Sequence, residues 1–189
     1  MESDKFIFCL EAVPDVEQQQ RTKAFQGLEQ LAYQHGIDSI YETCDTIEGL
    51  QDSLNVLLYD DHNFTNYEII YLVMHGEANN IRINDYYYSI EELAELFEGK
   101  MKRKIVHFAN VKELDLSQEE AQYFLDVTGA RAVSGYGAAF DTITSSKLDS
   151  VFFSLCQDQD SVVDIVEDLY AKQYNNCKLL DFRLYYNEQ

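Results

Sequence analysis

The amino-acid sequence predicts an α/β domain in which a mainly parallel β-sheet carries helices on both faces. Short apolar runs alternate with longer segments of helical periodicity, and this alternation is typical of βαβ units. The run at residues 68–74 (EIIYLVM) is apolar almost throughout, as expected for a central strand covered on both sides. With 189 residues and a hydrophobic content of 46%, the chain suits a single domain over residues 1–189.

The expected strands are short apolar runs bounded by turn residues. Pro14 and Asp15 end the first run, and Asn84-Asp85 separates the two arms of a small hairpin. About five or six strands are expected in the main sheet. The runs assigned to strands, the hairpin included, are residues 5–11, 37–43, 68–74, 80–83, 86–90, 104–108, 131–136 and 178–186.

Helices are expected where apolar residues recur every three or four positions after a capping residue. Ser89 with Glu92 and Ser117 with Glu120 form two capping boxes, each of which predicts a helix start. Gly36 is expected to end the first helix in the chain. The segments assigned to helices are residues 16–35, 46–58, 90–97, 118–127, 145–156 and 161–174.

The composition excludes several classes of function. The net charge is −20, from 34 acidic and 14 basic residues, and nucleic-acid binding requires clusters of lysine and arginine, so no nucleic-acid partner is expected. No apolar stretch reaches the roughly 20 residues of a membrane span, and no secretory signal is visible, so a cytoplasmic protein without membrane association is expected. The four cysteines form no C-x-x-C pair, and no metal or cofactor is expected.

Functional residues of a mainly parallel sheet belong just past the carboxyl ends of its strands. Three places qualify: His75-Gly76, the turn expected at residues 109–111, and the loop at residues 135–146. His75 alone at the end of an apolar strand is also compatible with a structural role. His107 lies inside an expected strand and is interpreted as a core histidine with a hydrogen-bond partner.

Several segments in order resemble an uncharacterised bacterial branch of the caspase-like (clan CD) cysteine peptidase superfamily. The similarity extends over roughly residues 5–157, and it implies a three-layer α/β/α sandwich. It also implies that His75 is the general acid/base and that Gly76 donates a hydrogen bond to the oxyanion. The matching segments are FCLE at 8–11, YLVMHGE at 71–77, IEELAELFEGK at 90–100, KIVHF at 104–108 and TGARAVSGY at 128–136.

The sequence departs from this superfamily at the nucleophile. The resembling proteins continue as His-Phe-Gly-Ser-Cys, whereas this chain has His-Phe-Ala-Asn-Val, so Val111 stands where the cysteine is expected. Valine has neither a lone pair to attack with nor a proton to lose, and Lys112 would need a desolvated environment to replace it. A catalytically inactive pseudo-peptidase is therefore expected, one that binds a peptide or protein partner in a regulatory or scaffolding role.

Other residues would shape such a binding cleft. By the resemblance, Asp141 lies in the region that lines the first specificity pocket and would select a basic residue, although a solvated loop aspartate is the alternative. Tyr87, in the run of tyrosines at residues 86–88, is expected to contact the partner together with Glu77, unless these tyrosines pack onto the adjacent helix. By analogy with caspase-like domains, the strand expected at 178–186 would form a homodimer.

Two other functions are compatible with the sequence. An active cysteine endopeptidase cleaving after a basic residue is expected if Val111 is an engineered replacement of the nucleophile. An unrelated α/β domain with a small-molecule site at the strand ends is the third reading, and the absence of a glycine-rich phosphate loop counts against it.

Overall fold

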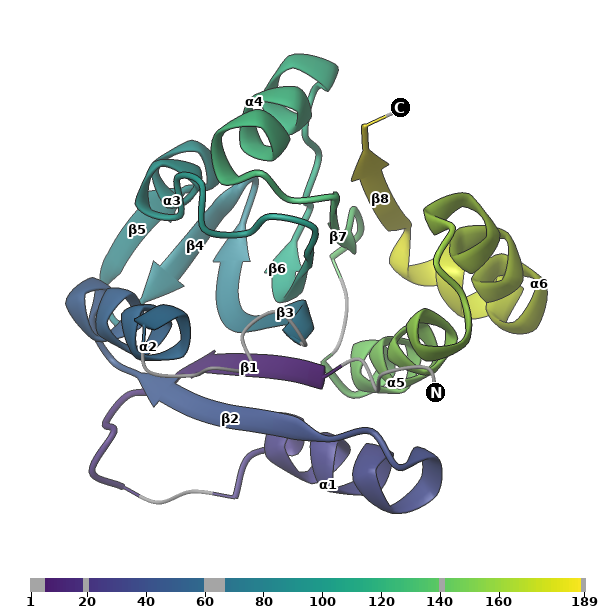
Figure 1. The fold of residues 1–189 in the computed structure, drawn as a ribbon, viewed down its shortest axis with the longest axis horizontal. Helices are drawn as coiled ribbons and strands as arrows, with labels where there is room; N and C mark the ends of the chain where they lie inside the picture. The colour runs from purple at the N-terminus through teal and green to yellow at the C-terminus, as the bar shows by residue number, and fades with distance from the viewer. Residues whose placement is uncertain (1–5, 19–20, 60–66, 140–141, 188–189) are drawn as a thin grey trace.

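The computed structural model describes residues 6–18, 21–59, 67–139 and 142–187, and it shows an α/β sandwich (Figure 1). The described strands form an eight-stranded sheet whose main path has the order β2-β1-β3-β6-β7-β8, and the β4-β5 hairpin is attached to β3. The pairs β1-β2, β1-β3, β3-β6 and β6-β7 are parallel, and β8 is antiparallel to β7. The strands are β1 (Phe6–Ala12), β2 (Ser39–Cys44), β3 (Tyr67–Glu77), β4 (Asn80–Ile83), β5 (Tyr86–Ser89), β6 (Ile105–Lys112), β7 (Ala132–Tyr136) and β8 (Phe182–Tyr186).

Helices cover both faces of the sheet, which gives the three layers. One core cluster joins one face of the sheet to α2, α3 and α4, and a second cluster joins the other face to α1, α5 and α6 (Figure 1). Each cluster takes alternate residues of the central strands, because neighbouring strand residues point to opposite faces. The helices are α1 (Lys23–His35), α2 (Ile47–Tyr59), α3 (Ile90–Leu96), α4 (Gln118–Thr128), α5 (Thr142–Asp158) and α6 (Val162–Leu180). The predicted fold class is confirmed.

Local capping signals predicted the helix starts well. Ser89 and Ser117 both form the expected capping boxes, in which the serine hydroxyl accepts from the backbone N–H three residues later. The predicted start of the first helix was wrong: α1 begins at Lys23 instead of residue 16. The reason is Thr22, whose hydroxyl accepts from the Phe25 N–H at 3.2 Å and caps the helix there.

The strands β3 and β6 are longer than predicted, and this extension shapes the candidate site. Residues 75–76 and 109–111 were expected to lie in turns, but both segments belong to strands. Gly76 pairs with Val111 on β6 and with Ile81 on β4, after a register irregularity between Val73 and Gly76. Pairing across three strands satisfies the backbone of these polar segments, so they continue the sheet beyond its apolar centre.

Candidate functional site

A small pocket of about 250 Å³ lies at the carboxyl end of β3. It contains four of the six residues that the sequence predicted for the site, together with two basic residues that the sequence analysis did not assign to it. We call it the strand-end pocket, and its lining residues are His75, Gly76, Glu77, Arg82, Tyr87 and Lys112.

Strand register explains why these side chains meet. His75 on β3 lies directly opposite Arg82 on β4, and Arg82 lies opposite Tyr87 on β5. Glu77 lies opposite Lys112 on β6. Directly paired residues point to the same face of a sheet with their Cβ atoms about 5 Å apart. The pocket is therefore formed by adjacent rows on one face of a four-strand platform.

The side chain of Val111 belongs to the opposite face. Val111 pairs with Gly76, which in turn pairs with Ile81, and this row alternates with the row that holds His75. Val111 and Ile81 are 1% exposed or less and lie in the core cluster that contacts α2, α3 and α4. The side chain at position 111 therefore does not face the imidazole of His75, contrary to the arrangement that the resemblance implies. The physical reason is that β6 continues through residue 111 instead of turning after Phe108.

Gly76 has a structural reason to be glycine. A Cβ atom at this position would collide with the backbone carbonyl oxygen of Asn80, where the chain reverses into β4. The reversal passes through Ala78 and Asn79, both with positive φ, and the Asn79 side chain exchanges hydrogen bonds with the backbone of Asp115. The tight turn alone thus requires glycine, independently of any approach by a substrate.

The remaining predicted residues fall into two groups. Tyr87 is 63% exposed and its neighbour Tyr86 is 70% exposed, whereas Tyr88 packs against the core. Tyr86 and Tyr87 therefore face solvent, and only Tyr88 packs inward. Asp141, predicted to line a specificity pocket, lies outside the described residues.

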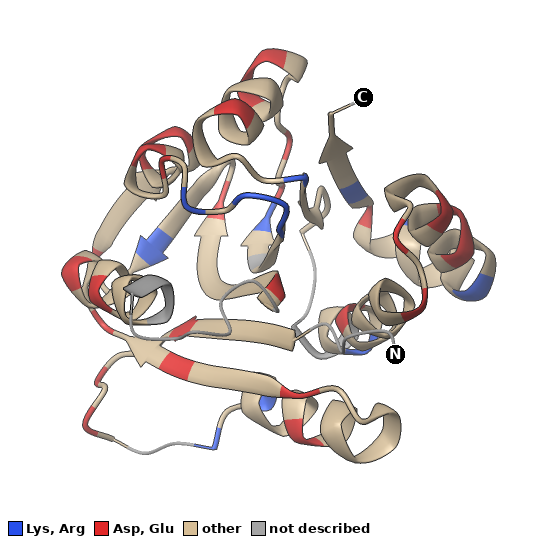
Figure 2. Ribbon diagram, in the orientation of Figure 1, with Lys and Arg blue, Asp and Glu red and all other residues tan. Residues whose placement is uncertain are grey.

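The strand-end pocket is basic on an acidic chain. Acidic residues are spread over helices of both outer layers (Figure 2). Within the described ranges, neither Arg82 nor Lys112 forms an ion pair or a side-chain hydrogen bond, although Glu77 lines the same pocket. The pocket therefore presents free cationic groups to solvent.

A separate polar cluster is buried between the sheet and α5. His107 contacts Ser134 Oγ through Nδ1 at 2.7 Å and Asp149 Oδ1 through Nε2 at 2.6 Å. The Tyr71 hydroxyl donates to Asp149 Oδ2 at 2.8 Å, and the Tyr136 hydroxyl donates to Asp149 Oδ1. The expectation of a core histidine with a hydrogen-bond partner is confirmed.

This cluster has the residue types of a hydrolase triad but not its accessibility. Ser134 and His107 are 0% exposed and Asp149 is 2% exposed, so a substrate cannot reach the serine hydroxyl. Burial, and then the Asp149 carboxylate, raise the pKa of Tyr71 and of Tyr136 well above the usual tyrosine range. Both phenols therefore stay protonated and donate to Asp149. The arrangement attaches α5 to the sheet and is structural.

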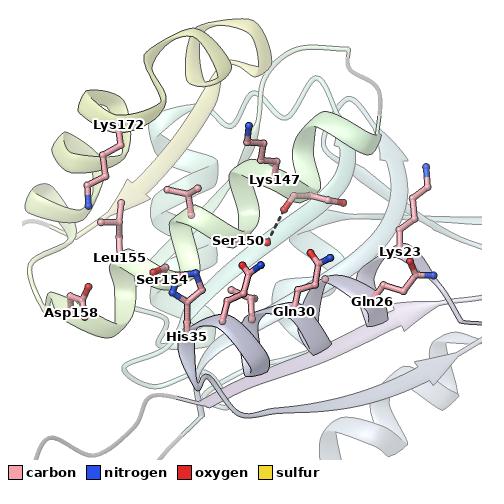
Figure 3. A pocket seen from close by; sticks show the side chains of 15 residues that line it. Lys23, Gln26, Gln30, His35, Lys147, Ser150, Ser154, Leu155, Asp158 and Lys172 are labelled. Atoms are coloured by element: carbon pink, nitrogen blue, oxygen red, sulfur yellow. Dashed lines mark hydrogen bonds between the residues drawn. The ribbon is translucent and has the colours of Figure 1, made fainter.

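A larger hollow of about 680 Å³ lies between α1 and α5 (Figure 3). Gln26 and Gln30 of α1 face Ser150 and Ser154 of α5 across it. None of the residues that the sequence predicted for the site lines this hollow. It is therefore distinct from the strand-end pocket.

Comparison with protein-family models assigns the chain to one family. Residues 4–186 match a family described as a family of unknown function, DUF6642. The chain belongs to this family. Among curated proteins, no match is found for it. The family description names no function, so the proposal below starts from the residues of the strand-end pocket.

The described residues lack two other kinds of feature. No helix there is both long and apolar enough to cross a membrane. In the same residues, no group of three or more histidine, cysteine, aspartate or glutamate side chains is placed to hold a metal ion.

Proposed function

We propose that this DUF6642 member is a caspase-like pseudo-peptidase domain that binds a peptide or protein partner at the strand-end pocket, in a regulatory or scaffolding role. The observation that carries the proposal is the strand-end pocket itself. It exposes an imidazole, a tyrosine ring and two cationic groups on paired strands, while the side chain at position 111 is 0% exposed. Exposed aromatic and arginine side chains on a rigid platform are the groups that anchor partners.

The environment of the candidate nucleophiles supports a binding role over a catalytic one. All four cysteines are buried, and burial raises the pKa of Cys44 to about 12 and that of Cys177 to about 11. The pKa of Cys9 is raised well above its usual range, first by burial and then by the charge of Glu11. Protonated, enclosed thiols are poor nucleophiles. Lys112 is solvent-exposed, which differs from the desolvated setting of a nucleophilic amine.

The same cysteines favour a cytoplasmic setting for the proposed function. None of the four forms a disulfide. Proteins of oxidising compartments use cysteine pairs as cross-links, whereas reduced core cysteines are common in the cytosol. We include this location in the proposal.

A peptide-directed thiol reagent tests the absence of peptidase chemistry. We expect an arginyl chloromethyl ketone to leave both the native chain and the Val111→Cys variant unlabelled, because the side chain at position 111 lies in the core. Labelling is measured by intact mass spectrometry, and the guanidinium-unfolded chain, whose thiols react freely with a small alkylating agent, is the positive control. Labelling of the native wild-type chain that disappears in His75→Ala would establish an active peptidase instead.

Peptide selection tests the binding role directly. Peptides selected from a random display library on the wild-type chain are expected to lose about tenfold or more in affinity for Tyr87→Ala, as for an aromatic anchor worth over 1 kcal/mol. Fluorescence polarisation gives the affinities. Tyr33→Ala is the matched control, because Tyr33 is 92% exposed on α1. Equal binding to the wild type, Tyr87→Ala and His75→Ala would exclude the strand-end pocket as the binding site.

A further inference from the structure

The strand-end pocket gathers positive charge on a chain of net charge −20. Arg82 and Lys112 reach it from β4 and β6, and among the described residues Glu77 is the one acidic residue in its lining. Tyr87 and His75 add hydrogen-bonding groups at its edge. The local charge is therefore opposite in sign to that of the whole chain.

Two other arginines of the described chain form ion pairs with carboxylates, whereas Arg82 forms none. Arg183 contacts Asp115 at 2.5 Å and Asp181 at 2.7 Å, and Arg21 contacts Glu29. Arg82 has no such partner among the described residues, although acidic side chains outnumber basic ones more than two to one.

We infer that the strand-end pocket recognises a single carboxylate, carried by an acidic residue of the partner. The inference rests on the proposed binding function and specifies its ligand. The Arg82 guanidinium binds the carboxylate through its planar fork, and the Lys112 ammonium adds a second positive charge. The Tyr87 ring packs against the methylene groups that precede the carboxylate.

Size and charge favour a carboxylate over a phosphate. The volume of about 250 Å³ suits one side-chain group and excludes a whole helix. Two cationic side chains and one anionic side chain leave one net positive charge, counting histidine as neutral, which a monoanion balances. A phosphate carries close to two negative charges, so Glu77 repels it more strongly than it repels a carboxylate. The preference is opposite to the basic selectivity that the resemblance assigns to Asp141.

Four short peptides that differ at one position test the inference. Acetyl-Ala-Ala-Xaa-Ala-Ala-amide with Xaa as Glu, Gln, Lys or phosphoserine is titrated into the full ¹⁵N-labelled chain. We expect the Glu peptide to shift the backbone amides of residues 75–77, 82 and 112, and to bind about tenfold more tightly than the Gln peptide, as a charge-assisted hydrogen bond provides. Added salt should weaken the binding of the Glu peptide more than that of the Gln peptide.

Two matched variants test whether the positive charge of Arg82 is responsible for the preference for the Glu peptide. Arg82→Gln is expected to remove the preference for Glu over Gln. Lys102→Gln, which removes one exposed positive charge just before β6 begins, is expected to keep it. Because both side chains are exposed, both variants should unfold at the wild-type temperature, and circular dichroism verifies this.

Each contrary outcome has a distinct meaning. Equal binding of the Glu, Gln and Lys peptides, no shift with any of the four, or a Glu preference that survives Arg82→Gln would overturn the carboxylate inference. Tighter binding of the phosphoserine peptide would replace the carboxylate with a phosphate and also overturn it. If display-selected peptides without an acidic residue still depend on Tyr87, the carboxylate inference fails while the proposed function stands. Selected peptides whose affinity is unchanged by Tyr87→Ala and His75→Ala would overturn both the carboxylate inference and the proposed function.

Discussion

Replacing Asp149 with alanine is expected to lower the free energy of unfolding by about 3–5 kcal/mol, because it leaves several buried hydrogen-bonding groups unsatisfied. Asp149 accepts hydrogen bonds from Tyr71 and Tyr136 and contacts the ring of His107. Its removal leaves three buried polar groups without this partner and opens a cavity between α5 and the sheet. Equilibrium denaturation with urea, followed by circular dichroism, measures the change.

Two companion variants separate this network from a general effect of charge. Asp149→Asn keeps one acceptor oxygen and should cost less than Asp149→Ala. Asp158→Ala removes an exposed aspartate at the end of the same helix and should change the free energy of unfolding by less than about 0.5 kcal/mol. If Asp149→Ala costs no more than Asp158→Ala, the buried network does not attach α5 to the sheet.

Gly76→Ala is expected to destabilise the fold by about 1–3 kcal/mol, the usual cost of overpacking. The added methyl group meets the backbone of Asn80, which cannot move aside as a flexible side chain would. Strain at this turn should also displace β4 and so weaken peptide binding at the strand-end pocket. Thermal and urea denaturation report the stability, and the peptide titration reports the pocket.

Gly27→Ala is the matched control for this substitution. Gly27 lies inside α1, and a Cβ atom there would meet nothing within 4 Å. Alanine favours the helix over glycine by about 0.5–1 kcal/mol, so this variant should be slightly more stable than the wild type. A Gly76→Ala variant as stable as Gly27→Ala would show that the turn at residues 77–80 is looser than described.

Some site residues are easier to predict from the sequence than others. Arg82 and Lys112 join the pocket only through cross-strand register, which sequence patterns specify weakly for short polar segments. A signal was nevertheless present in the hairpin: Ile81 and Ile83 are buried, so Arg82 between them has to point away from the core. Likewise, Asp149 stands four residues before Phe153 on α5, and this spacing places both residues on the same, buried face of the helix.

The sequence by itself determined the fold class, most of the strands and the capped helix starts, because apolar periodicity and capping act within a few residues of the chain. Tertiary structure alone decided that β3 and β6 extend past their apolar centres, that Val111 turns into the core, and that His75 lies beside Arg82. These features depend on which strands pair and in what register. Register is a property of residues distant in sequence, and a shift of one position moves every side chain to the opposite face.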